Sequence, residues 1–212
     1  MFVVPLHQID HQELVDWSFD VSFAFGIPRE PAPPRSLPLV VDVLDAFARG
    51  GCHGTAWFEV EGLDLAATFP SCTGLAECAA AGWLDLGEVT LREPSNGPDL
   101  GEPDLNESGP GESGLGESGL GESGLGESGL GESGLGEPAP AGDDDGKPAL
   151  LDPESPVGSI AFRKPNPVAV LHAVTELTRT SGPMLVFDDL ADRVFVVAPG
   201  DTYEGLAKFW PW

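Results

Sequence analysis

Residues 157–198, VGSIAFRKPNPVAVLHAVTELTRTSGPMLVFDDLADRVFVVA, contain the signals of a strand, a helix and a β-hairpin in that order. Asn166-Pro167 is typical of a helix start, because Asn caps the first turn and Pro is tolerated at the first helical position. Apolar residues then recur at helical spacing until Ser181-Gly182-Pro183, which ends the helix. The flanking apolar runs predict strands at residues 157–162, 184–187 and 194–198, the last two paired as a hairpin.

The same order of elements recurs upstream. In residues 17–25 large apolar side chains alternate with small or polar ones, which predicts a strand. Apolar residues at helical spacing follow within residues 36–51, and two glycines end that pattern. Residues 55–60 and 65–69 are then expected to form a second hairpin.

Further strands are predicted at residues 2–6 and 84–91, the latter with a bulge at Gly87. Two β-α-β-β-like units favour an α+β fold, in which a mainly antiparallel sheet carries helices on one face.

Between the two units lies a low-complexity segment with five identical GESGL pentapeptides at residues 111–135. Residues 92–156 consist mainly of Gly, Pro, Ser, Glu and Asp, and such a composition buries too little apolar surface to offset the entropy of ordering it. The sequence therefore predicts a disordered acidic linker over 92–156. Residues 1–91 and 157–212 are expected to form one discontinuous α+β domain, because the second piece alone is marginally small.

The formal net charge of −25 is unevenly distributed. The linker carries −14, residues 1–91 carry −10 and residues 157–212 carry −1. Without a basic patch to neutralise phosphates, direct binding to nucleic acid or to an anionic membrane is disfavoured, whereas a basic protein partner fits the charge. The competing interpretation is that the negative charge only keeps the protein soluble.

Two acidic clusters coincide with the predicted hairpin tips. Glu59, Glu61 and Asp64 form the first, and Asp188, Asp189 and Asp192 form the second. The first cluster is the predicted contact surface for a basic partner. The alternative is that these acids are ordinary turn residues, since Asp is favoured in turns for its local hydrogen bonds.

A thiol nucleophile is the candidate for catalysis. Cys72 lies between a predicted strand and a short helix predicted over 74–81, where helix N–H groups lower a thiol pKa, and His53 is the candidate base. The glycine frame of a nucleophile elbow is missing. Inert, buried thiols at Cys52, Cys72 and Cys78 are the competing interpretation.

No group of potential ligands in the sequence has the residue spacing of a known metal or cofactor site. His7 and His11 are four residues apart, but Pro5 precedes them and the helical periodicity is weak. Cys52, His53, Cys72 and Cys78 lack the paired spacing of a zinc knuckle. We therefore expect neither a metal nor a cofactor.

The chain ends in KFWPW, residues 208–212, whose aromatic side chains are expected to pack back onto the core. An exposed aromatic anchor for a partner is the alternative, because Trp is enriched in interface hot spots.

The function predicted from these features is that of a non-enzymatic cytosolic binding protein of bacterial type. It would cover a basic site on a protein partner, as acidic inhibitor or immunity-like proteins do. An odd cysteine count and the lack of a signal peptide or apolar span favour the cytoplasm. The alternative is a small hydrolase or transferase that uses Cys72 with His53. The sequence carries no signal for an oligomeric state.

Overall fold

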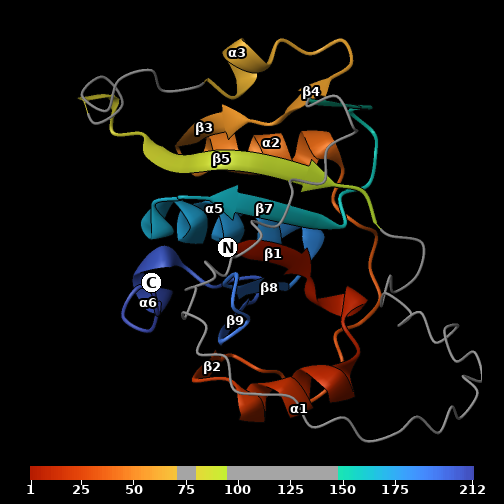
Figure 1. Cartoon of the computed structure of the whole chain (residues 1–212), viewed down its shortest axis with the longest axis vertical. Coiled ribbons are helices and arrows are strands. Elements are labelled where there is room, and N and C mark those ends of the chain that lie inside the picture. The colour runs from red at the N-terminus through yellow and green to blue at the C-terminus, as the bar shows by residue number, and fades with distance from the viewer. Residues whose placement is uncertain (71–79, 95–147) are drawn as a thin grey trace, which may run out of the picture. The chain divides into compact units, whose positions relative to one another are not determined.

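The computed structural model describes residues 1–70, 80–94 and 148–212, and its main element is a mixed sheet of seven strands (Figure 1). In the order in which they lie side by side, the strands are β2 (Phe23–Phe25), β9 (Arg193–Val197), β8 (Met184–Phe187), β1 (Phe2–Pro5), β7 (Ser159–Arg163), β5 (Leu84–Arg92) and β3 (Cys52–Ala56). Neighbouring strands are antiparallel except for the two outermost pairs, β2–β9 and β3–β5. The predicted α+β class with a mainly antiparallel sheet is confirmed.

Strands from both sides of the GESGL repeat are interleaved in this sheet. β5 precedes the repeat and pairs antiparallel with β7, which follows it, with Val89 opposite Phe162. β1 lies between β7 and β8. Because β1 forms ladders only with strands from the C-terminal part of the chain, the two flanks of the repeat share one hydrogen-bonded sheet.

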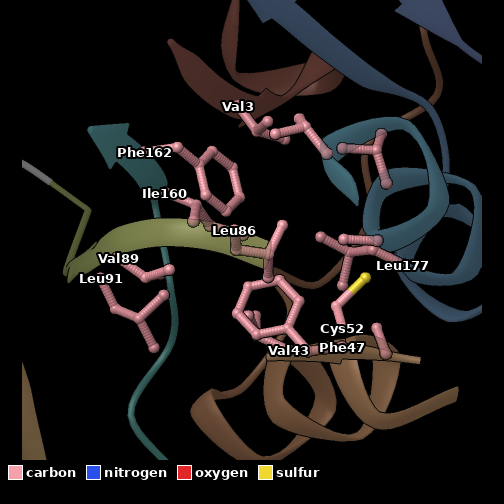
Figure 2. Packing of buried hydrophobic residues seen from close by; sticks show 14 of the residues in the cluster. Val3, Val43, Phe47, Cys52, Leu86, Val89, Leu91, Ile160, Phe162 and Leu177 are labelled. Atoms are coloured by element: carbon pink, nitrogen blue, oxygen red, sulfur yellow. The ribbon is translucent and has the colours of Figure 1, made fainter. Parts of the chain in front are cut away.

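Two helices, α2 (Val40–Arg49) and α5 (Pro167–Ser181), cover one face of the sheet. The Asn166 side chain accepts a hydrogen bond from the Val168 N–H group, and Gly182 with φ of 84° ends α5, as the sequence predicts. Figure 2 shows side chains of the sheet and the two helices, among them Leu86, Phe47 and Leu177, directed into the shared core. Burial of this apolar surface is the main stabilising contribution.

The strand predicted at residues 17–25 is wrong for most of its length. The structure has helix α1 (His11–Asp20) there, and only Phe23–Phe25 form a strand. The Asp10 side chain caps the helix by accepting from the N–H groups of Gln12 and Glu13. This N-cap is a helix signal in the sequence, but the alternation of apolar residues is the stronger local pattern and indicates a strand.

Helix α1 also adds a second, smaller core. Its Leu14 packs with Leu185 of β8 and with Val194 and Val196 of β9. The intervening residues of β8 and β9, whose side chains point the other way, belong to the core under α2 and α5. Since successive side chains of a strand point to opposite faces, α1 lies on the face opposite to α2 and α5.

The hairpin predicted at residues 55–69 is also wrong. β4 (Phe58–Val60) leaves the main sheet, and residues 65–68 form a helical turn, α3 (Leu65–Thr68), capped by the Asp64 side chain. The partner of β4 is β6 (Ala149–Leu151), which pairs with it in parallel.

The linker predicted over 92–156 therefore ends too late. Residues 95–147, including all GESGL copies, lie outside the described residues, but residues 148–156 have a defined structure. Leu151 is buried, and the N–H groups of Val40 and Val41 donate to the carbonyl oxygens of Ser155 and Pro153. One buried apolar residue and a few backbone hydrogen bonds hold this short segment against the fold. Amino-acid composition does not predict such contacts, so it places the end of the linker too late.

The bulge predicted in the strand at residues 84–91 is present in the structure. From His53 to Thr55 of β3 the chain advances by two residues, while its partners on β5 advance by three, from Asp85 to Glu88. The extra residue of β5 lies next to Gly87, which has φ of 68°. This is the predicted bulge.

The C-terminal aromatic residues pack back onto the core, as expected. The Trp210 indole N–H group donates to the Pro167 carbonyl oxygen at 3.0 Å, and the ring stacks edge-on against Phe195. The short helix α6 (Tyr203–Leu206) precedes them and is capped by the Thr202 side chain, which accepts from the Gly205 N–H group.

Candidate functional site

The predicted partner-binding acids Glu59 and Glu61 lie on the outer side of β4. Phe58 and Val60 are buried, at 2% and 5% exposure, so the alternating residues of this short strand point to solvent. Glu59 is exposed, and so are Trp57 in the bend before β4 and Glu61 in the turn after it.

An exposed leucine completes this face. Leu150 of β6 is the register partner of Glu59, and its side chain is 66% exposed, while Trp57 is 48% exposed. Residues in register on neighbouring strands project to the same side of a sheet. We call the set Trp57, Glu59, Glu61 and Leu150 the β4–β6 face. It combines two carboxylates with two large apolar groups.

Backbone hydrogen bonds hold the β4–β6 face on the fold. The Trp57 N–H group donates to the Val89 carbonyl oxygen of β5 at 2.8 Å, and the Glu61 N–H group donates to the Leu151 carbonyl oxygen at 2.9 Å. The first bond ties β4 to the main sheet and the second ties it to β6. Glu59 is thus presented by a strand, whereas Glu61 is the first residue of the turn after β4.

The third predicted contact residue, Asp64, has a local role. Its side chain accepts from the Ala66 N–H group at 3.0 Å and caps α3, and its carbonyl oxygen accepts from the Thr68 hydroxyl. This is the turn role that favours Asp at such positions. The carboxylate is exposed, but it is not part of the β4–β6 face.

The second acidic cluster is also engaged in the turn between β8 and β9. Asp192 accepts from the backbone N–H and the hydroxyl of Ser22, and these bonds hold the pKa of its carboxyl below the usual value. Asp188 accepts from the Asp192 N–H group, and Asp189 pairs with the amino group of Met1. Through Ser22 and the Met1 amino group, these acids connect the starts of β2 and β1 to the turn.

The proposed base of the thiol dyad, His53, is buried in β3 with 1% exposure. Its Nδ1 atom lies 3.9 Å from Oδ1 of Asp85, beyond hydrogen-bond distance, and its ring lies 6.0 Å from that of Trp83. The proposed nucleophile Cys72 lies outside the described residues, as do Cys78 and the helix predicted over 74–81 apart from its last two residues.

Cys52 is a buried thiol. Its sulfur lies 3.4 Å from the Ala169 carbonyl oxygen in the main core, and burial raises its pKa to about 12. Because Cys52 and His53 are adjacent in a strand, their side chains point to opposite faces and cannot both bind one zinc ion.

The spacing of His7 and His11 does not place them on one helix. His7 belongs to the 3-10 turn η1 (Leu6–Gln8), and His11 is the first residue of α1. The His11 Nε2 atom is hydrogen-bonded to the Pro28 carbonyl oxygen, and burial together with the Arg35 charge lowers the pKa of His7. Across residues 1–70, 80–94 and 148–212, no cluster of three or more potential metal ligands is found.

Sequence reasoning missed the apolar half of the β4–β6 face. The sequence pattern puts Trp57 inside a predicted hairpin arm and Leu150 inside the predicted linker. The available signal was the pair Leu150-Leu151, the only adjacent bulky apolar residues in that acidic segment.

No protein-family model, curated protein or solved structure matches this chain. In the part of the chain that the structure describes, no helix has the length and apolar character needed to cross a membrane.

Proposed function

We propose that this chain is a non-enzymatic binding protein that docks a basic protein partner on the β4–β6 face. The observation that carries the proposal is the register of Glu59 with Leu150 beside the exposed Trp57, which brings charged and apolar groups together on one solvent-facing surface. Interfaces are recognised by aromatic anchors at the centre and by complementary charge around them.

The charge of the chain supports the choice of a basic partner. Among the described residues, no ion pair involves Glu59 or Glu61, so their charges are available to a partner. The net charge of −25 adds a long-range attraction that accelerates encounter with a basic surface. In this proposal the protein acts in the cytoplasm and covers a basic site, in the manner of acidic inhibitor or immunity-like proteins.

The enzyme alternative receives no comparable support from the described residues. His53 is buried, Cys52 faces the opposite side of the sheet, and Cys72 lies outside the described residues.

The test is affinity capture from a lysate of the source organism with the full-length wild type, a Trp57→Ser variant and a Glu59→Gln/Glu61→Gln variant. A Glu30→Gln/Glu154→Gln variant, which changes two exposed acids elsewhere, is the matched control. Captured proteins are quantified at about 50 mM and about 500 mM salt, because salt screens exposed charges.

We expect a basic protein that is captured by the wild type and the control variant, is lost at high salt, and is lost from both face variants at low salt. Equal capture by the control and the two face variants would show that any partner binds elsewhere and would contradict the proposal.

A further inference from the structure

The connection between β2 and α2 is rich in proline, with five prolines in residues 28–38, PREPAPPRSLP. A proline ring fixes φ at about −65°, and a residue that precedes proline is restricted to extended conformations. Residues 31–38 form neither helix nor strand, and none of them has a positive φ. The sequence and the backbone together indicate a polyproline II segment, which has about three residues per turn.

This segment is anchored to the fold at both ends. The Pro28 carbonyl oxygen is hydrogen-bonded to the His11 Nε2 atom at 3.1 Å, and the Pro38 carbonyl oxygen accepts from the Val157 N–H group at 2.8 Å. Between the two anchors, no backbone hydrogen bond joins residues 29–37 to the rest of the described chain. The segment is therefore held in place while its carbonyl groups remain open to a partner.

One side of the segment faces the fold and another faces solvent. Ala32 packs against the second, smaller core. Arg35, three residues later, lies against Gly182, where an added Cβ atom would be 2.7 Å from its Cδ atom. Residues three apart lie on the same side of a polyproline II helix, so Pro31 and Pro34 share a different side. Both of these prolines are exposed.

Exposed prolines at this spacing have a characteristic type of partner. A PxxP segment docks into a groove lined by aromatic side chains, and a segment that is already extended and anchored loses little conformational entropy on binding. We propose that residues 31–36 form a docking segment for a partner domain with an aromatic-lined groove, in which the rings of Pro31 and Pro34 are seated. This second interaction surface is separate from the β4–β6 face and does not depend on the proposed function.

The experiment measures binding of the full-length protein to a panel of isolated SH3, WW and EVH1 domains, which bind polyproline II segments, by surface plasmon resonance. We expect at least one domain to bind the wild type and to bind a Pro31→Ala/Pro34→Ala variant about tenfold more weakly. Pro199→Ala, at an exposed proline in the turn after β9, is the matched control and leaves the affinity unchanged.

A synthetic peptide tests the contribution of the anchors. Acetyl-EPAPPRSL-amide, which has the sequence of residues 30–37, is expected to bind the same domain about threefold to tenfold more weakly than the folded protein, because it must be ordered on binding. Equal or tighter binding of the peptide would show that anchoring contributes nothing and would overturn that part of the inference.

Binding of no domain in the panel overturns the inference and leaves the prolines as a rigid connector only. It is also overturned if the wild type and the double proline variant bind equally well, because another surface is then recognised. The thermal transition of each variant shows whether it folds. If the double variant does not fold, Pro31→Ala and Pro34→Ala are measured separately, and unchanged affinity in both overturns the inference.

Discussion

Glu59 of β4 and Leu150 of β6 face each other in a parallel ladder, although the GESGL repeat lies between them in the sequence. The parallel pair places an exposed carboxylate beside an exposed aliphatic side chain, while the next residue of β6, Leu151, is buried. The short strand β6 thus contributes one residue to the candidate site and one to the core.

This division predicts different costs for two adjacent leucines. Leu151→Ala is expected to lower the free energy of unfolding by about 2–3 kcal/mol, because it removes buried methyl groups and leaves a cavity. Leu150→Ala, the matched control, is expected to change it by less than about 0.5 kcal/mol. Urea denaturation followed by far-UV circular dichroism measures both. Equal effects would show that β6 does not pack as described.

Replacement of residues 97–145 by a Gly/Ser bridge of about 12 residues is expected to leave one cooperative unfolding transition, because β5 and β7 pair across the replaced segment. Calorimetry measures the transition. A longer replacement, of residues 97–152, also removes β6 and is expected to lower the midpoint. Two separate transitions, or independent folding of residues 1–96, would contradict a single discontinuous domain.

The bulge of β5 makes Gly87 difficult to replace. A Cβ atom at this position would lie 2.3 Å from the Arg163 carbonyl oxygen, and the backbone has φ of 68°. Gly87→Ala is therefore expected to cost about 3 kcal/mol or more of unfolding free energy. Gly51→Ala has a similar φ of 64° but open space around the new atom, so about 1 kcal/mol is expected. Chemical denaturation of the two variants gives the comparison.

The hydrogen bonds from Ser22 to Asp192 predict a pH-dependent contribution to stability. Since they lower the pKa of the folded-state carboxyl below its ordinary value of 3.8, this contribution is present above that value. It is lost as the pH falls through the folded-state pKa.

The thermal midpoints of wild type and Ser22→Ala, measured between about pH 2 and pH 6, are therefore expected to differ most at the upper end and to approach each other in acid. Ser18→Ala removes a hydroxyl that bonds only to a backbone carbonyl, and its effect should not depend on pH in this range. A difference between wild type and Ser22→Ala that is constant with pH would contradict the role of the Asp192 carboxylate.

The raised pKa of Cys52, about 12, predicts a thiol that does not react in the folded protein. In a Cys72→Ser/Cys78→Ser variant, labelling by a thiol reagent near neutral pH should follow global unfolding and become fast only in urea. Rapid labelling of Cys72 in the wild type, lost in His53→Ala, would instead support the enzyme alternative.

The second half of the fold could be predicted well because its signals are local. Asn166-Pro167 and Gly182 mark the ends of α5, and the apolar runs on either side of it are too short for helices. The first half carries competing signals: the alternation of residues 17–25 indicates a strand, yet the Asp10 cap starts a helix.

The candidate site could be predicted only in part, because part of it depends on contacts between residues distant in sequence. Glu59 and Glu61 are recognisable as acids near a turn, but the exposure of Trp57 and Leu150 depends on the pairing of β4 with β6, which is distant in sequence. No local pattern encodes that pairing. Asp64, in contrast, was grouped with the two glutamates although its side chain caps α3.

The interleaving of the sheet has a consequence for synthesis on the ribosome. β1 forms ladders with β7 and β8, and β2 forms its ladder with β9, so both strands have their partners beyond the GESGL repeat. A nascent chain that ends before β9 therefore leaves the backbone donors and acceptors of β2 without their native partners. Completion of the sheet therefore requires that synthesis has passed β9.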